Sequence, residues 1–144
     1  MSRRDLTVSR FTALVLYIDG SVEGNPGPGA IGVVATGADG TPVEAWGEAI
    51  GHVTNNQAEY QALLAGLRKA RQLGARTVTV RSDSQLLVRQ FLGEYRVKDP
   101  KLKPLHAEAR RLAGSFKSFA IEHVPREANR AADRLANQAR LAQT

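Results

Sequence analysis

The order of strand-like and helix-like segments constrains the fold of this chain more than any other feature of its sequence. Three segments rich in apolar and β-branched residues come first, at about 13–19, 30–36 and 43–50. A helix, a strand, two helices, a strand and a final helix are expected to follow. A helix between two strands makes a crossover that pairs them in parallel, whereas short turns make antiparallel hairpins. We therefore predict an α/β fold in which helices cover a mixed sheet.

Turn residues separate the segments of the first third. The sequence GNPGPGA at 24–30 cannot be helical, because its prolines restrict the residues that precede them. We expect a loop there, with the first strand ending at Asp19 and a turn beginning at Gly20. The Asp-Gly pair at 39–40 is a strong hairpin signal before the third strand. The first three strands should therefore pair as an antiparallel meander.

Caps and apolar stripes mark the remaining segments. Thr54 or Asn55 can cap a helix that runs to about Leu73 with an apolar stripe along one face. Asp83 and Ser84 can cap another helix directly after a strand. The elements expected in this part are helices at about 55–73, 85–95 and 105–113, strands at 76–82 and 116–124, and a final helix after the connection 125–128.

Four acidic residues lie near the ends of these expected elements, in the motifs YIDGS, NNQAEY, RSDSQ and NRAADRLA: Asp19, Glu59, Asp83 and Asp133. Each one alone is more often a solvated charge or a cap than a metal ligand. If the first and fourth strands are neighbours, however, Asp19 and Asp83 come together. A converged cluster of carboxylates is too repulsive to persist without cations. The set therefore predicts a divalent-metal site.

The charge balance favours a polyanionic partner. The chain has 20 Lys and Arg against 14 Asp and Glu, a formal net charge of +6, which suits phosphate neutralisation. Charge alone leaves nucleic-acid binding undecided. The chain has no cysteine, which excludes disulfides, thiolate zinc sites and a cysteine nucleophile and is consistent with a reducing compartment. We expect a soluble, cytoplasmic protein.

The N-terminal segment is predicted to be a basic tail at residues 1–12, followed by a single domain at 13–141. Arg3 and Arg4 precede an apolar run and could mimic a twin-arginine export signal. That run, from Phe11 to Ile18, is short and leads directly into Asp19, so we interpret it as a core strand. No stretch approaches the roughly 20 apolar residues of a membrane span, and no membrane association is expected.

Taken together, YIDGS with GNPGPGA, TNNQAEYQAL, SDSQ and NRAADRLA resemble the ribonuclease H type 1 family, in the family's order and over about Ala13 to Ala139. The resemblance implies an RNase H-like fold, a five-stranded mixed sheet of order 3-2-1-4-5 whose first three strands are antiparallel. It also implies a hydrolase, a metal-dependent endonuclease that cuts the RNA strand of an RNA/DNA hybrid and leaves 3′-hydroxyl and 5′-phosphate ends.

The same resemblance implies the roles of the acids. Two Mg²⁺ ions, or Mn²⁺ in their place, would be bound in each active site. Asp19 would bridge the two ions, Glu59 and Asp83 would complete the shell of one, and Asp133 would help to hold the other. Two ions about 3.5 to 4 Å apart can activate a water, neutralise the gathering charge and assist the leaving oxygen.

The resemblance further implies substrate contacts. Asn25, Asn56 and Gln85 fall at positions that contact the RNA strand, where a 2′-hydroxyl distinguishes RNA from DNA. Thr54 and Asn55 fall near a phosphate of the DNA strand. From the residues alone, Asn25 could be a turn residue, Asn55 a cap and Gln85 a surface residue. The complete expected set of substrate-binding residues is Asn25, Thr54, Asn55, Asn56, Gln85, Asn129 and Arg126.

Two features depart from the family pattern. Many members carry a histidine in a longer loop before the last helix, but the connection at 125–128 is short and contains Arg126 instead. Arg126 is the better substitute because a guanidinium binds phosphate, whereas His123 is expected to play a structural part in the last strand. The Trp-rich basic handle of some relatives is also missing. The basic segment 96–103 could bind the DNA strand or be a solvated turn.

Two other functions on the same fold stay open. A non-catalytic nucleic-acid-binding module is disfavoured, because a pure binder gains nothing from four carboxylates facing phosphates. A nuclease directed at DNA is disfavoured by the asparagines and the glutamine near the acids, which suit a reader of the 2′-hydroxyl. Nothing in the sequence requires an oligomer, so a monomer is expected.

Overall fold

The computed structural model describes residues 12–142, so the tail expected at 1–12 lies outside the described residues except for Thr12. The elements, in chain order, are β1 (Ala13–Val22), β2 (Gly27–Gly37), β3 (Pro42–Val53), α2 (Asn55–Gln72), β4 (Thr77–Ser82), α3 (Gln85–Phe91), α4 (Lys103–Gly114), β5 (Ser118–His123), the 3₁₀ turn η1 (Arg126–Asn129) and α5 (Arg130–Ala142). Within residues 12–142, none of the helices has the length and apolar character to cross a membrane.

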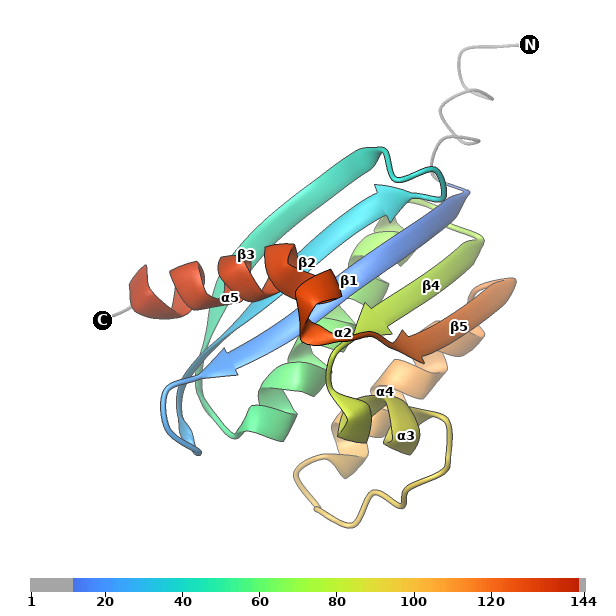
Figure 1. Ribbon diagram of the computed structural model, residues 1–144. Helices are drawn as coiled ribbons and strands as arrows, with labels where there is room; N and C mark the ends of the chain where they lie inside the picture. The colour runs from blue at the N-terminus through green and yellow to red at the C-terminus, as the bar shows by residue number, and fades with distance from the viewer. Residues whose placement is uncertain (1–11, 143–144) are drawn as a thin grey trace, which may run out of the picture.

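The five strands form one mixed sheet in the order β3-β2-β1-β4-β5 (Figure 1). The hairpin partners β1 and β2, and β2 and β3, are antiparallel. Because α2 lies between β3 and β4, and α3 and α4 lie between β4 and β5, the added strands join in parallel. The strand order, the strand directions and the fold class predicted from the sequence are confirmed.

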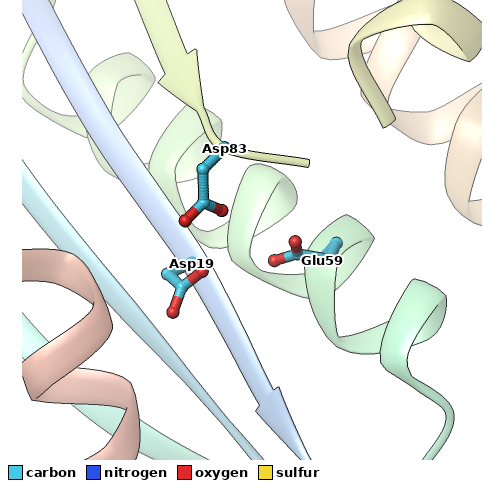
Figure 2. Close-up of side chains that lie close together, drawn as sticks. All are labelled: Asp19, Glu59 and Asp83. Atoms are coloured by element: carbon cyan, nitrogen blue, oxygen red, sulfur yellow. The ribbon is translucent and has the colours of Figure 1, made fainter. Parts of the chain in front are cut away.

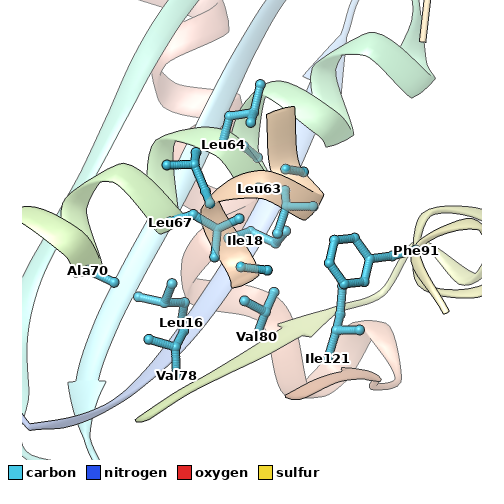
Figure 3. Close-up of a cluster of buried hydrophobic side chains, with 14 of the residues drawn as sticks. Leu16, Ile18, Leu63, Leu64, Leu67, Ala70, Val78, Val80, Phe91 and Ile121 are labelled. Carbon is cyan, nitrogen blue, oxygen red and sulfur yellow. The ribbon is translucent and has the colours of Figure 1, made fainter. Parts of the chain in front are cut away.

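Helices cover both faces of the sheet. In Figure 1, α5 crosses one face over β1, β2 and β3, while α2, α3 and α4 lie on the other face. The larger core lies between the sheet and α2, where leucines of the predicted stripe meet alternate residues of β1 and β4; it includes Leu16, Ile18, Leu63, Leu67 and Val80 (Figure 3). Complete burial of such a side chain stabilises the fold by about 1.5 to 3 kcal/mol. This core fixes the position of α2 relative to β1.

The contact between α5 and the sheet is of a different kind. Ala132 and Ala136 are fully buried there, above glycines of β2 and β3. A Cβ atom added at Gly32 would lie 2.0 Å from the Ala132 carbonyl oxygen, and one at Gly47 would lie 2.3 Å from the Leu135 carbonyl oxygen. The helix backbone therefore rests directly on the strand backbones, which no residue other than glycine allows at these two positions.

The ends of several elements differ from the prediction. β1 continues to Val22, so Asp19 lies inside the strand, and the turn expected at Gly20 is wrong. β2 begins at Gly27 instead of at residue 30, because the hairpin closes early, with the Glu23 N–H donating to the Pro28 carbonyl oxygen at 2.9 Å.

The helix expected at 85–95 ends at Phe91. Gly93 follows the cap with a φ of 83°, a left-handed conformation that stops the helix. The hairpin predicted at 39–40 is confirmed, with Gly40 at a φ of 86° between β2 and β3.

Candidate active site

Three of the four acidic residues converge at one point (Figure 2). Asp19 comes from β1, Glu59 from the second turn of α2, and Asp83 from the residue after β4. One carboxylate oxygen of each lies within 4.8 Å of the corresponding oxygens of the other two. Asp19 and Asp83, which are 64 positions apart in the chain, thus meet where β4 ends beside β1. This is the place predicted for neighbouring first and fourth strands.

The parallel pairing of β1 and β4 brings the two aspartates together. Ile18 is paired with Ser82, so Asp19 and Asp83 follow at the same level of the sheet. Ser84, not Asp83, caps α3 by accepting a hydrogen bond from the Leu87 N–H at 3.2 Å. The Asp83 carboxylate is therefore left to point toward Asp19, as Figure 2 shows.

Glu59 is held by the backbone of β1. The Gly20 N–H donates to Glu59 Oε1 at 2.6 Å. A Cβ atom at Gly20 would lie 2.7 Å from both the Ala58 carbonyl carbon and the Glu59 nitrogen. Glycine at this position therefore lets the strand approach the first turns of α2, rather than starting a turn as the sequence suggested.

Burial and mutual repulsion dominate the electrostatics of these acids. Asp19 is 5% exposed. Burial, followed by the charges of Glu59 and Asp83, raises its pKa from 3.8 to about 9. Burial likewise raises the pKa of Glu59 from 4.5 to about 8, although the hydrogen bond from Gly20 acts in the opposite direction. The ionised forms of both groups therefore lack a compensating positive charge.

A divalent cation fits this set of donors. Oxygen atoms that share a Mg²⁺ ion at about 2.1 Å are at most about 4.2 Å apart, so the 4.8 Å limit on the three oxygens leaves only small side-chain rotations to make. Hard oxygen donors are those that Mg²⁺ and Mn²⁺ prefer. A bound cation would also supply the positive charge that Asp19 and Glu59 lack. Asp19, Glu59 and Asp83 are thus the residues that would hold a metal.

Asp133 lies at the outer side of the same site. It belongs to the first turn of α5, and its hydrogen bond and its charge both contribute to the raised pKa of Asp19. A cavity of about 390 Å³ joins Asp133 to the acids, and its lining consists of Asp19, Gly20, Asp83, His123, Pro125, Arg126 and Asp133. The structure therefore brings all four acids together, three of them in a tight cluster and Asp133 beside it.

His123 also lines this cavity, which the structural role expected from the sequence did not include. It is the last residue of β5 and is paired with Ser82, the residue before Asp83. Its place at the carboxyl end of a strand parallel to β4 is the signal that could have identified it, because such strand ends share one edge of the sheet. Arg126 lines the same cavity.

Several expected substrate residues gather at the N-terminus of α2. Thr54 caps this helix in a capping box with Gln57, while the Asn55 N–H donates to Asn25 Oδ1 at 3.0 Å. The loop between β1 and β2 is thereby tied to the helix that carries Glu59. Asn56 is half-buried there, and Gln85 is exposed at the start of α3.

Asn129 does not fit the substrate contact expected of it. Its side chain is 1% exposed, and its Nδ2 donates to the Ile18 carbonyl oxygen at 2.8 Å. Asn129 therefore ties η1 to β1 one residue before Asp19. Its Oδ1 atom has no hydrogen-bond partner among the described residues. The side chain positions the strand and offers no surface to a substrate.

Comparisons with known proteins agree with this geometry. Residues 17–139 match the family described as reverse transcriptase-like. Ribonuclease HI of Halobacterium salinarum is 46% identical over 123 residues, which cover 85% of this chain and 62% of that protein. A bifunctional protein of Mycobacterium tuberculosis is 46% identical over 88% of this chain, but only 35% of its own length is covered. The chain thus spans less than two thirds of these curated relatives.

Two solved structures match over nearly their whole length. The RNase H1 of Halobacterium salinarum superposes with a TM-score of 0.88 at 43% identity, covering 92% of this chain and 99% of that one. LC11-RNase H1, solved in complex with an RNA/DNA hybrid, gives a TM-score of 0.86 at 38% identity, with 90% and 98% covered. The chain therefore belongs to the reverse transcriptase-like family and, within it, to the type 1 ribonucleases H.

Proposed function

We propose that this protein is an endoribonuclease that hydrolyses the RNA strand of RNA/DNA hybrids with the help of two divalent cations, leaving 3′-hydroxyl and 5′-phosphate ends. The observation that carries the proposal is the convergence of Asp19, Glu59 and Asp83 from three elements, with oxygens within 4.8 Å of one another. Its support is the similarity to LC11-RNase H1, whose structure was solved with an RNA/DNA hybrid.

The carboxylates have distinct parts in this proposal. Asp19, Glu59 and Asp83 would hold one cation, and Asp133 with Asp19 would hold the second on the α5 side. Mg²⁺ is the proposed ion and Mn²⁺ its substitute, because both prefer oxygen donors. When bound, the ions supply a Lewis acid for the phosphoryl oxygens and a nucleophilic water at neutral pH. The buried Asp19 and the hydrogen-bonded Glu59 hold that chemistry in one geometry.

Recognition of the RNA strand is assigned to the polar residues beside the acids. Asn25, Asn56 and Gln85 are proposed to contact that strand, with Glu59 within reach of a 2′-hydroxyl. Thr54 and Asn55 are proposed to lie near a DNA phosphate. The hydrogen bond between Asn55 and Asn25 supports a single shared surface for the two strands, because it joins the hairpin loop to α2.

The decisive test compares four substrates in one assay: an RNA/DNA hybrid, double-stranded RNA, double-stranded DNA and a duplex with a single ribonucleotide. We expect cleavage of the hybrid in Mg²⁺ or Mn²⁺ that stops with a chelator. Asp83→Asn should lower the rate by at least about 10³-fold, roughly 4 kcal/mol of transition-state stabilisation, with an unchanged circular dichroism spectrum. Equal cutting of DNA would refute the substrate, and full activity of the variant would refute the site.

The protonation of the leaving oxygen is assigned to His123. It lines the cavity of the acids, and an imidazole can donate a proton near neutral pH whereas the Arg126 guanidinium cannot. His123→Ala should lower kcat by about 10² with little change in KM, and most strongly at low pH, where a general acid carries the proton that it donates. Arg126→Ala should instead raise KM. If His123→Ala leaves the pH profile of kcat unchanged, the histidine has no part in proton transfer.

A further inference from the structure

We propose that Arg126, Arg130 and Arg134 form a second binding surface, the arginine row, which holds the phosphates of the RNA strand next to the one that is cut. The proposal rests on the proposed function, since it extends the substrate beyond the acids. It concerns a cavity of about 380 Å³ lined by Arg126, Glu127, Arg130, Asp133 and Arg134.

The arginine row adjoins the acidic cavity directly. Arg126 and Asp133 line both cavities, so a chain that leaves the acids past Asp133 enters the space beside the row. In the proposed function, the phosphate that is cut lies in the acidic site and belongs to the RNA strand. The neighbouring phosphates of that strand must therefore lie in the adjoining space. This continuity favours the RNA strand over the DNA strand as the occupant.

Two of the three arginines share one face of α5, and the third precedes that helix in η1. Arg130 and Arg134 are four residues apart on α5, and such residues share a face and are separated by about 6 Å along the axis. Arg126 continues the spacing in η1. Successive phosphates of one strand are about 3.4 Å apart along a duplex axis. The row is thus long enough to contact more than one phosphate.

The charges of the row are available to a ligand. Among residues 12–142, no carboxylate forms an ion pair with Arg126, Arg130 or Arg134, and Arg130 and Arg134 are exposed. Arg140, on the same helix, is paired with Glu23 at 3.7 Å. Three guanidiniums outnumber the two carboxylates of the cavity, Glu127 and Asp133, and a guanidinium binds phosphate oxygens in a bidentate manner.

The test measures binding apart from cleavage. An Asp83→Asn background prevents turnover, and Arg130→Gln with Arg134→Gln removes two charges at nearly constant side-chain length. Binding of a fluorescent RNA/DNA hybrid is followed by anisotropy between about 50 and 200 mM salt. Two lost phosphate contacts should make the slope of log K against log salt shallower by about 1.8, so that the difference in affinity shrinks roughly tenfold across this range.

The matched control is Arg68→Gln with Arg71→Gln in the same background. Both arginines are exposed on the C-terminal part of α2. Replacing them lowers the net charge of the protein by the same two charges as the test variant. At these salt concentrations, charges more than about 10 Å away are largely screened, and the control should keep the parent slope. An unchanged slope in the test variant, or an equal change in the control, overturns the proposal. Matching melting temperatures exclude a folding defect.

The choice of strand is tested with neutral methylphosphonates, one at a time, in either strand of the hybrid. A substitution in the RNA strand beside the cut site should weaken binding by the parent but not by the Arg130→Gln, Arg134→Gln variant, because the contact is already lost. The assignment is overturned if an RNA-strand methylphosphonate weakens binding equally in the parent and the variant. It is also overturned if the two proteins differ only for methylphosphonates in the DNA strand. Cleavage by the unmodified chain tests the proposed function separately, since the salt slope does not depend on turnover.

Discussion

Asp19 receives a carboxylate neighbour from each face of the sheet, and the two faces deliver it in different ways. Glu59 arrives on α2, whose leucines fill a core of large side chains. Asp133 arrives on α5, whose backbone rests on the glycines of β2 and β3. Large side chains can repack around a change, whereas backbone atoms in contact cannot move apart without displacing the helix. The α5 side should therefore be the less tolerant of substitution.

The largest effect expected from this difference is that of Gly32→Ala. The added methyl would lie 2.0 Å from the Ala132 carbonyl oxygen, so α5 must shift and carry Asp133 with it. We expect a loss of about 3 kcal/mol in the free energy of unfolding, measured by urea denaturation, together with lower activity.

Gly114→Ala is the matched control. Gly114 lies in α4, and a Cβ atom there meets nothing within 4 Å, so alanine should be neutral or stabilising by up to about 1 kcal/mol. If the two substitutions have the same effect, the close packing of α5 is not what holds Asp133.

A smaller effect on the free energy of unfolding, a gain instead of a loss, is expected from substitution of Asp19. With its pKa raised to about 9 in the folded chain against 3.8 for an ordinary aspartate, ionised Asp19 destabilises the metal-free fold. The cost is absent below about pH 4, grows as the pH rises and is complete above pH 9. In a chelator, Asp19→Asn should therefore be more stable than the parent at pH 8, by on the order of 2 kcal/mol.

Urea denaturation of both proteins in EDTA at several pH values measures this difference, which should vanish toward pH 4. Added Mg²⁺ should stabilise the parent more than the variant. A difference that is constant with pH would mean that the asparagine acts through packing instead of charge.

The smallest effect is expected at the start of α2. Thr54→Ala removes the side chain that accepts from the Gln57 N–H at 3.2 Å, and loss of such a cap costs about 1 kcal/mol. Thr54→Ser keeps the hydroxyl and should keep the stability. Because the core holds α2 in place, kcat should stay close to that of the parent. A large fall in kcat for the alanine variant would show that the α2 side is as sensitive as the α5 side.

The sequence predicted the sheet well because its evidence is local. Crossover helices determine the strand directions. Each acidic motif lies within or directly after a strand or helix that the sequence predicts. Gly20 was misread, because a glycine that ends a strand and a glycine that lets a helix approach give the same sequence signal. The role of Asn129 also depends on a tertiary contact, since its partner, the Ile18 carbonyl, lies 111 residues away. His123 was given a structural role because its own segment shows only a strand; its place beside the acids follows from combining the predicted pairing of β4 with β5 and the position of His123 at the carboxyl end of β5.

The contact between Gly20 and α2 has a consequence for attempts to transplant this site. The peptide that follows Asp19 donates the hydrogen bond that orients Glu59, so one stretch of backbone sets the angle between two of the carboxylates. A designer who copied the carboxylates onto another strand and helix, but kept an ordinary residue after the aspartate, would separate the two elements and lose that angle. The smallest portable unit of the site is therefore four acids and a glycine.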